Sequence, residues 1–254
     1  VMTSRPVLSD IGKFFPATLE LATVAILLAI AVGVPLGVYA AARQGSRLDH
    51  FARFVALSGQ SVPVFVLGLG CLVLFYAKLG IAPGTGQIDV AYEGMIPPVT
   101  GMLVVDALIE GDWDVFWDAL AHLAQPALVL AWFSMAYIAR MTRAFTIEAL
   151  GGEYIVAARA KGLSPARVLW GHAFGNIAVR LTTVIALAYA GLLEGAVITE
   201  TVFSWPGLGL YLTVSLLNAD MNAVLGATLV VGLIYLVLNL LSDALYRLLD
   251  PRVR

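Results

Sequence analysis

The sequence is poor in charge and almost without cysteine. Only 13% of its 254 residues are charged, whereas 60% are hydrophobic and the mean hydropathy is +0.90. Because soluble domains average about 25% charged residues, this composition excludes an ordinary soluble protein and indicates an integral membrane protein. The single cysteine, Cys71, lies inside an apolar run, which excludes a disulfide framework and a cysteine-based metal site.

Motifs that carry catalysis are missing as well. The sequence contains no His-Glu-x-x-His pair, no glycine-rich phosphate loop and no Gly-x-Ser-x-Gly elbow. Its three histidines, His50, His122 and His172, are too scattered to suggest a metal site. We therefore predict that the chain is not an enzyme, that it binds no cofactor, metal or nucleic acid itself, and that it works within a lipid bilayer.

Five apolar runs are long enough to cross a bilayer, which takes about 20 residues in a helix. The predicted spans are 14–42, 54–78, 122–145, 177–199 and 222–249. The apolar patch 102–109 is too short to span and is interrupted by Asp106, so we expect a surface or re-entrant helix there. The predicted fold class is all-α, with residues 1–254 forming a single transmembrane domain.

Lysine and arginine are missing from the longest loop. Residues 79–121 contain acidic side chains but no basic one, whereas most of the 15 basic residues lie in the loops 43–53 and 140–180 and in the C-terminal tail. Basic loops remain on the cytoplasmic side of a membrane. We therefore predict that the loop 146–176 and the C-terminus are cytoplasmic and that 79–121 is extracytoplasmic.

This orientation places the N-terminus of a five-span chain outside the cytoplasm. Residues 1–13, however, carry no export signal, and the first residue is Val1 rather than methionine. We therefore expect a sixth span upstream of this sequence.

The charged segment Glu153–Asn176 separates two apolar spans and carries the signals of a helix, a turn and a second helix. Gly162 favours the left-handed conformation that ends a helix. Ser164 followed by Pro165 is the pair expected where the next helix begins. The pattern therefore predicts a cytoplasmic helix-turn-helix, which we interpret as a docking element.

One helix is expected over 147–161. It would place Ile155, Ala158 and Gly162 near one face. The small side chains of Ala157 and Ala158 would let a partner surface approach closely. Arg159 and Lys161 would point elsewhere.

The spacing Ala157-Ala158-x-x-x-Gly162 resembles the cytoplasmic signature loop of ABC importer permeases. The wider string ARAKGLSPARVLWGHAFGN is similar to the version in dipeptide, oligopeptide and nickel importer permeases. Further segments of this chain look like the same family: PATLELA, RMTRAF, ETVFSWPGLG and LLDPRVR. The resemblance covers essentially the whole chain, and the string SVPVFVLGL is similar to the first of the two paired permeases of such systems.

Four positions depart from the general importer signature. Val156 stands at its glutamate position, so no role of a glutamate carries over to this residue. His172, Phe174 and Gly175 stand at its isoleucine, leucine and proline positions. Gly175 lacks the fixed kink of a proline, which predicts a more flexible junction with the span 177–199.

The resemblance implies an ABC type I importer-like transmembrane domain in the cytoplasmic (inner) membrane of a prokaryote. It implies that the loop 146–176 couples the chain to an ATP-binding subunit. The implied coupling residues are Ala157, Ala158, Gly162, Ile155, Arg159 and Lys161. The implied partners are a second homologous permease, two ATP-binding subunits that hold ATP and Mg, and an extracytoplasmic substrate-binding protein docking on 79–121 and 200–221.

Two sets of polar residues within the spans have open roles. Glu194 lies in 177–199, and a carboxylate at mid-membrane costs about 2.5 to 3.5 kcal/mol, so it must face protein or water. It either lines the translocation path and meets a cationic substrate group, or it holds helices together as a protonated or paired glutamate. Ser58, Gln60 and Ser61 either line the same path or pack helices together.

Two alternatives compete with the importer permease. An ion-coupled secondary transporter would usually carry inverted repeats and discontinuous helices around an ion site, and the sequence gives little sign of these. An intramembrane enzyme would need a paired nucleophile and base or a set of metal ligands. Glu200, beside the turn at Pro206, is expected to be structural and to accept backbone hydrogen bonds. The cargo stays open among peptides, nickel chelates, glutathione and related small solutes.

Overall fold

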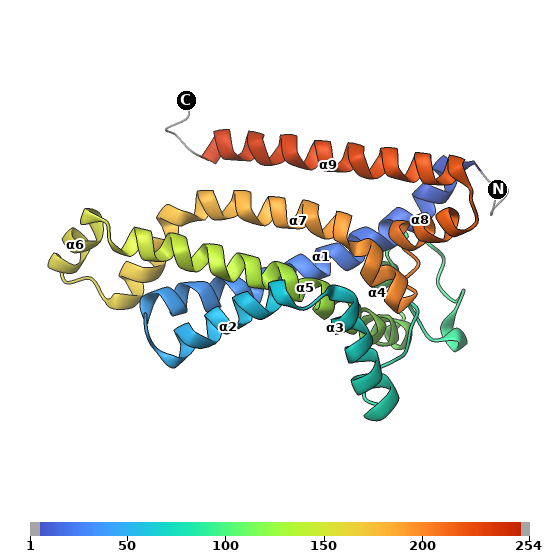
Figure 1. Ribbon diagram of the computed structural model, residues 1–254, viewed down its shortest axis with the longest axis horizontal. Coiled ribbons are helices and arrows are strands. Elements are labelled where there is room, and N and C mark those ends of the chain that lie inside the picture. Colours follow the sequence, from blue (N-terminus) through green and yellow to red (C-terminus); the bar gives the residue numbers. More distant parts are fainter. Residues whose placement is uncertain (1–5, 250–254) are drawn as a thin grey trace. The chain divides into compact units, whose positions relative to one another are not determined.

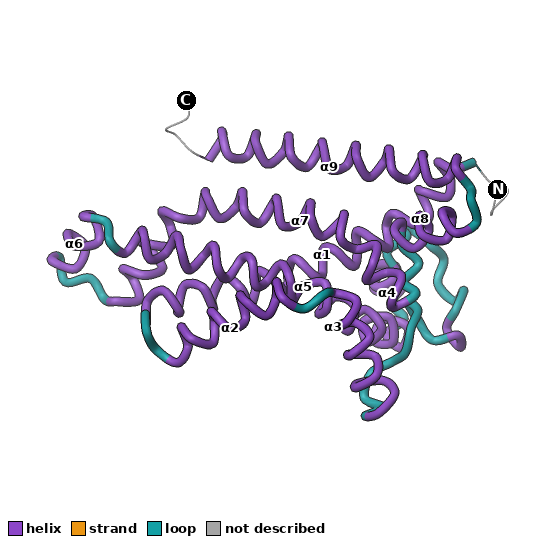
Figure 2. The backbone as a smooth tube through the Cα atoms, viewed as in Figure 1, coloured by secondary structure: helices purple, strands orange, loops and turns teal. Residues whose placement is uncertain are grey.

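The structure, a computed structural model, describes residues 6–249, and every regular element in that range is a helix (Figure 1). The long helices are α1 (Val7–Ala42), α5 (Trp113–Leu150), α7 (Gly175–Phe203) and α9 (Met221–Leu249). The shorter ones are α2 (Arg47–Ser61), α3 (Val64–Cys71), α4 (Leu103–Glu110), α6 (Glu153–Ala160) and α8 (Leu208–Leu217). The remaining turns are the π-helical η1 (Leu72–Lys78) and η3 (Arg167–Phe174) and the short 3₁₀ helix η2 (Val90–Tyr92). Most of the non-helical backbone lies between η1 and α4 (Figure 2).

Four helices of the described chain are long and apolar enough to cross a membrane. They are Val7–Ala42, Trp113–Leu150, Arg167–Phe203 and Met221–Leu241. They overlap four of the predicted spans and are mostly longer, because their ends continue past the apolar runs. The third includes η3, and Gly175 at the junction of η3 with α7 has a right-handed helical backbone, with φ −54° and ψ −38°. The flexibility predicted for this junction stays a prediction. The limits of the membrane itself stay a prediction.

The predicted span 54–78 is not one continuous helix. It comprises the second half of α2, a break, and then α3 with η1. The break falls at Pro63, whose extended backbone (φ −60°, ψ 137°) precedes α3. Proline has no N–H to donate and disfavours a helical conformation in the residue before it, so the interruption has a local cause. These pieces make a fifth crossing only if the broken pair counts as one span.

The chain forms two compact units, which we describe separately. Unit 1 is built from the described parts of Val1–Ala25, Val62–Leu130 and Gly191–Leu236. Unit 2 is built from those of Ile26–Ser61, Ala131–Ala190 and Val237–Arg254.

Unit 1 has an apolar cluster around the start of α1. Its buried members are Ile11, Leu208, Tyr211, Ala223 and Ala227. The ring of Phe14 stacks on that of Tyr211 at a centroid distance of 5.0 Å, which orients α8 against α1. Small alanines on α9 let this helix approach the cluster closely.

Unit 2 packs α1 against α5 through glycines. A Cβ on Gly33 would lie 3.0 Å from the carbonyl oxygen of Met135, and one on Gly37 would lie 2.6 Å from that of Ala139. Glycines four residues apart share one helix face and allow backbones to approach closely, as in other membrane helix pairs. The sequence Gly33-x-x-x-Gly37 therefore forms the contact between these two helices.

The short helix expected at 102–109 is confirmed as α4. Asp106 does not break it but lies buried in it and accepts hydrogen bonds from the N–H groups of Val99, Thr100 and Gly101 (3.2, 2.8 and 3.0 Å). Burial alone would raise the pKa of Asp106, but these hydrogen bonds and that of the Thr100 hydroxyl outweigh it and lower the pKa. The carboxylate thus folds the loop back onto the start of α4.

Candidate functional site

The predicted helix over 147–161 is two helices. Helix α5 ends at Leu150 and α6 begins at Glu153, with Gly151 and Gly152 between them. Gly152 has an extended backbone (φ −73°, ψ 147°) and its carbonyl accepts the first hydrogen bond of the new helix from Ile155. Adjacent glycines carry a high conformational cost in a helix, which explains the break.

The predicted end of this helix is confirmed at Gly162, which has φ +77°. The N–H of Gly162 donates to the carbonyl of Arg159 at 2.9 Å, and the N–H of Leu163 donates to that of Ala158 at 3.3 Å. This pair of bonds is a Schellman motif, which satisfies the last carbonyls of α6. The chain leaves α6 in one fixed direction as a result.

The predicted start of the next helix is confirmed as well. The helix begins at Pro165, and the Ser164 hydroxyl accepts a hydrogen bond from the Arg167 N–H at 3.4 Å. This is the arrangement of an N-cap serine followed by a first-turn proline.

The two faces of α6 differ in what they contact. Ile155 and Ala158 are buried in unit 2, in a cluster with Val168, Ala173 and Ile177. They therefore face inward and are not available to a partner. The exposed residues of α6 and of the turn that follows include Val156, Ala157, Arg159, Lys161 and Gly162. Of the six predicted coupling residues, two are therefore buried and anchor α6, and the other four are exposed: Ala157, Arg159, Lys161 and Gly162.

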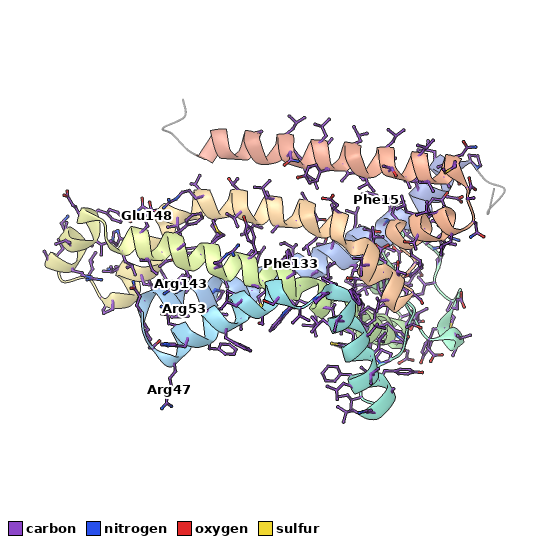
Figure 3. The ribbon with its side chains drawn as sticks, viewed as in Figure 1. Phe15, Arg47, Arg53, Phe133, Arg143 and Glu148 are labelled. Carbon is purple, nitrogen blue, oxygen red and sulfur yellow. The ribbon has the colours of Figure 1, made fainter. Side chains whose placement is uncertain are left out.

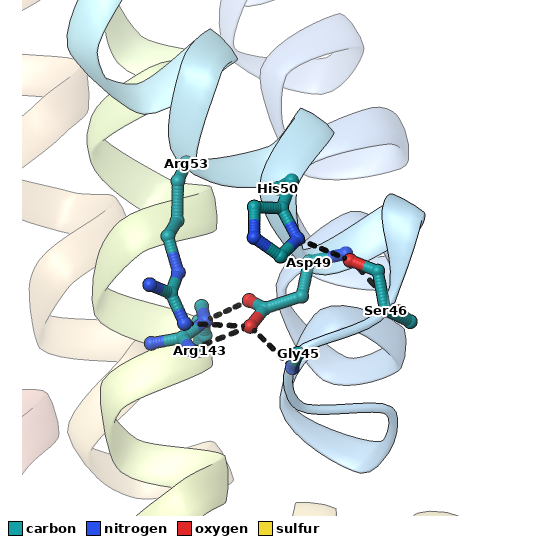
Figure 4. A network of polar contacts seen from close by, with 6 residues as sticks. All are labelled: Gly45, Ser46, Asp49, His50, Arg53 and Arg143. Carbon is teal, nitrogen blue, oxygen red and sulfur yellow. Dashed lines mark hydrogen bonds and ion pairs between the residues drawn. The ribbon is translucent and has the colours of Figure 1, made fainter.

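A buried carboxylate joins α2 to α5 near this element (Figure 4). Asp49 is 0% exposed and accepts hydrogen bonds from Arg143 (Nε 2.6 Å and Nη2 3.1 Å), from Arg53 (2.7 Å) and from the N–H of Gly45 (3.0 Å). The bidentate arginine contact fixes geometry as well as charge. No pattern in the sequence pairs Asp49 with Arg143, because the two residues are 94 positions apart.

A second ion pair in unit 2 lies closer to α6. Arg180 on α7 donates to both carboxylate oxygens of Glu148 on α5 (3.1 and 2.9 Å). Its guanidinium also lies over the ring of Phe145, 4.7 Å from the centroid. Glu148 is labelled in Figure 3. This ion pair therefore links α5 to α7, the helices that precede and follow the docking element.

In unit 1 a buried glutamate organises the turn after α7, as predicted for Glu200. Its carboxylate is 0% exposed and accepts hydrogen bonds from the Thr18 hydroxyl (2.7 Å) and the Leu210 N–H (2.9 Å). A Cβ on Gly207 or Gly209 would collide with this carboxylate, so both glycines are required by the packing. The structural role of Glu200 is confirmed.

Residues of the PATLELA segment form the other side of this polar core. The Thr18 hydroxyl accepts from the Leu208 N–H at 2.8 Å, and the indole of Trp205 donates to the carbonyl of Ala17 at 2.9 Å. Glu20 accepts from the Val104 N–H at 2.8 Å and from Gln87 at 3.2 Å. The start of α1, the loop 79–102 and the turn 204–207 are therefore held together by one polar core in unit 1.

The predicted path residues are not brought together by either unit. Glu194 is exposed on α7 in unit 1 and has no side-chain partner within the described residues. In unit 2, the hydroxyls of Ser58 and Ser61 donate to carbonyls of their own helix, at 3.1 and 2.8 Å. The side chain of Gln60 lies outside the described residues.

The chain matches a protein-family model along most of its length. The family is described as a binding-protein-dependent transport system inner membrane component, and the match covers residues 33–254.

Curated relatives are similar over essentially the whole chain. A probable D,D-dipeptide transport system permease protein of Escherichia coli K12 is 45% identical over 100% of this chain and 74% of its own length. A di/tripeptide transport system permease protein of Pseudomonas aeruginosa is 43% identical over 99% and 74%. A dipeptide transport system permease protein of E. coli K12 is 42% identical over 100% and 75%.

A solved structure shares the fold. It is an inward-facing form of the MetNI methionine ABC transporter, which covers 98% of this chain and 100% of the compared chain with a TM-score of 0.70 at 15% identity. The family match and the relatives together show that this chain belongs to the binding-protein-dependent transport system inner membrane components, the permease subunits of ABC importers.

Proposed function

We propose that this chain forms the translocation path of an importer for peptides or similar small solutes and is driven by ATP hydrolysis in partner subunits. The names of its relatives, which are dipeptide and di/tripeptide permeases, support the cargo class. Family membership favours this function over the ion-coupled secondary transporter. A permease is not itself catalytic, so ATP and Mg belong to the ATP-binding subunits.

Coupling to those subunits is proposed to run through α6. The observation that carries this proposal is the division of its faces: Ile155 and Ala158 anchor α6 in the apolar cluster of unit 2, while Ala157 and Lys161 face outward. A helix fixed in this way moves together with α5 and η3 as a rigid body when a partner pushes on its outer face. The small Ala157 allows close approach, and the positive charge of Lys161 suits an acidic partner surface.

The other partners follow from the same orientation. A second, homologous permease completes the path, and two ATP-binding subunits lie on the cytoplasmic side with the C-terminus. A substrate-binding protein is proposed to dock on 79–121 and 200–221. The hydrogen bonds of Glu20, Glu200 and Asp106 support this placement, because they hold the loops of unit 1 in a defined shape.

Within the path, Glu194 is proposed to meet a cationic group of the substrate. Its exposure on α7 and its lack of a side-chain partner among the described residues support this role over that of a carboxylate paired within the chain. Ser58 and Ser61 contact their own helix, which favours a packing role for them.

Co-purification tests the proposal. The affinity-tagged chain, extracted from its native membrane, should bring a second permease and ATP-binding subunits with it, and a peptide-loaded binding protein should stimulate their ATPase activity. Replacing Ala157 by Trp should release the ATP-binding subunits, whereas Ala121→Trp, an exposed alanine of unit 1, should retain them. Peptide uptake by the purified chain alone, driven by an ion gradient, would overturn the proposal.

A further inference from the structure

Unit 2 contains a cavity of about 520 Å³ beside the docking element. The end of α1 contributes Tyr39 and Arg43 to its wall, and the end of α6 with the following turn contributes Arg159 and Leu163. The π-helical segment η3 contributes Leu169 and Trp170. The cavity thus lies between the end of α1 and the segment formed by α6, its following turn and η3.

The walls of this cavity combine apolar surface with interfacial aromatics. The ring of Tyr39 meets that of Trp170 edge to face, with centroids 5.7 Å apart. Tyrosine and tryptophan concentrate where a membrane meets water, because each has an apolar body and a polar atom. Leu163 and Leu169 provide a surface that suits hydrocarbon rather than a hydrated ion.

Two arginines supply the charge. Arg43 and Arg159 are exposed at the cavity, and in the described part of the chain neither guanidinium has an acidic partner. The arginines of the nearby networks, Arg53, Arg143 and Arg180, all contact carboxylates. The cavity is therefore positively charged and has no counter-ion among the described residues of unit 2.

Two predicted spans, 14–42 and 122–145, end beside the cavity, whose lining includes Ala42 and Leu150. Gly37 of α1 packs against Thr142 and Arg143 of α5, so the ends of the two predicted spans lie at a similar level. On the proposed orientation this level is the cytoplasmic leaflet, where anionic lipids attract basic residues.

We propose that this cavity binds an anionic phospholipid of the cytoplasmic leaflet. Arg43 and Arg159 face the phosphate, and the acyl chains lie on the apolar wall. Guanidinium groups suit phosphate because they present several N–H donors in one plane. A bound lipid would link the end of α1 to the end of α6, and so would help to hold the docking element. This inference depends on the proposed function for its membrane side.

The experiment uses the complete transporter in nanodiscs of phosphatidylcholine, with phosphatidylglycerol titrated in and retained lipid counted by native mass spectrometry. The variant Arg43→Gln/Arg159→Gln should bind phosphatidylglycerol roughly tenfold more weakly, since each basic residue near the surface contributes to attraction of anionic lipid. The matched control Arg47→Gln/Arg167→Gln removes the same charge from exposed residues that do not line the cavity. Arg47 points away from the helices in Figure 3. The control should bind like the wild type.

The proposal would be overturned by equal affinity in the wild type and the cavity variant or by an equal loss in the control. Full displacement of the lipid by inorganic phosphate would overturn it too, because it would indicate a simple anion site. Lipid that enters only after the ATP-binding subunits are stripped off would also overturn it, because a protein group would then fill the cavity. Co-purification of the ATP-binding subunits is measured separately. Its loss would count against the proposed function, whereas a loss of lipid selectivity alone would count against the lipid site.

Discussion

Arg143 on α5 holds the buried carboxylate of Asp49 on α2 with two parallel hydrogen bonds, Nε to Oδ1 at 2.6 Å and Nη2 to Oδ2 at 3.1 Å. Arg53 completes the contact from the next turn of α2 at 2.7 Å. Because Asp49 is covered while Arg53 is 54% exposed, Arg143 is the partner that the carboxylate depends on within unit 2. The pair fixes α2 to α5.

Replacing Arg143 by Ala should therefore destabilise the protein. Asp49 would keep only Arg53 and the backbone N–H of Gly45, and a buried polar group that loses a partner costs about 1 to 3 kcal/mol. Thermal unfolding of the purified transporter, followed by size-exclusion chromatography after heating, measures the loss. The double variant Asp49→Asn/Arg143→Gln should recover part of it.

The control for this prediction is the second ion pair. Arg180 and Glu148 are 39% and 66% exposed, and surface ion pairs contribute only about 0 to 1 kcal/mol. Arg180→Gln should change thermal stability much less than Arg143→Ala. An equal loss in both would contradict the special dependence of Asp49 on Arg143.

The close contact of α1 with α5 gives a second prediction. Gly37→Ala should destabilise unit 2 by about 1 to 3 kcal/mol, because its Cβ would lie 2.6 Å from a backbone oxygen that cannot rotate away. Gly12→Ala is the matched control on the same helix, since nothing lies within 4 Å of its Cβ position. The two thermal midpoints should separate, and equal midpoints would contradict the packing described here.

How much of this structure was predictable depends on the distance over which each signal acts. Gly162 and Ser164 were readable because the conformation of a helix end is decided within a few residues. The break at Gly151 was also local, and the adjacent glycines were its signal. Thr18 and Glu200, by contrast, are 182 positions apart. No pattern in a single sequence predicts which distant side chains meet. The structural role of Glu200 was therefore predicted, but its contact with Thr18 was not.

Asp106 predicts a pH dependence of stability. Its pKa in the folded protein is lowered, so the carboxylate contributes stability that is fully present above the unfolded pKa of about 4. That contribution is lost as the pH falls through the folded pKa. Asp106→Asn should lower the thermal midpoint at pH 6, and the gap to the wild type should narrow below about pH 4. A gap that stays constant with pH would contradict the prediction.

Glu194 predicts a dependence of transport on substrate charge. If it meets a cationic substrate group, Glu194→Gln should reduce uptake of peptides with a lysine side chain more than uptake of neutral peptides, because the amide keeps the size of the side chain but not its charge. Uptake of labelled peptides into proteoliposomes measures this ratio. An unchanged ratio with wild-type rates would remove Glu194 from the path.

Gly162 predicts a loss of coupling without a loss of ATP hydrolysis. Its φ of +77° is strained for a β-branched residue, by about 1 to 2 kcal/mol. Gly162→Val should therefore open the Schellman turn and let α6 move independently of η3, so that ATP hydrolysis no longer moves the spans.

The matched control is Gly162→Asn, because asparagine tolerates the left-handed conformation. We expect Gly162→Val to hydrolyse ATP while importing little peptide, and Gly162→Asn to keep both activities. Normal peptide uptake with substrate-stimulated ATPase activity in Gly162→Val would contradict the coupling role of this turn. Loss of both activities in both variants would mean that coupling requires the free space around Gly162 rather than its backbone conformation.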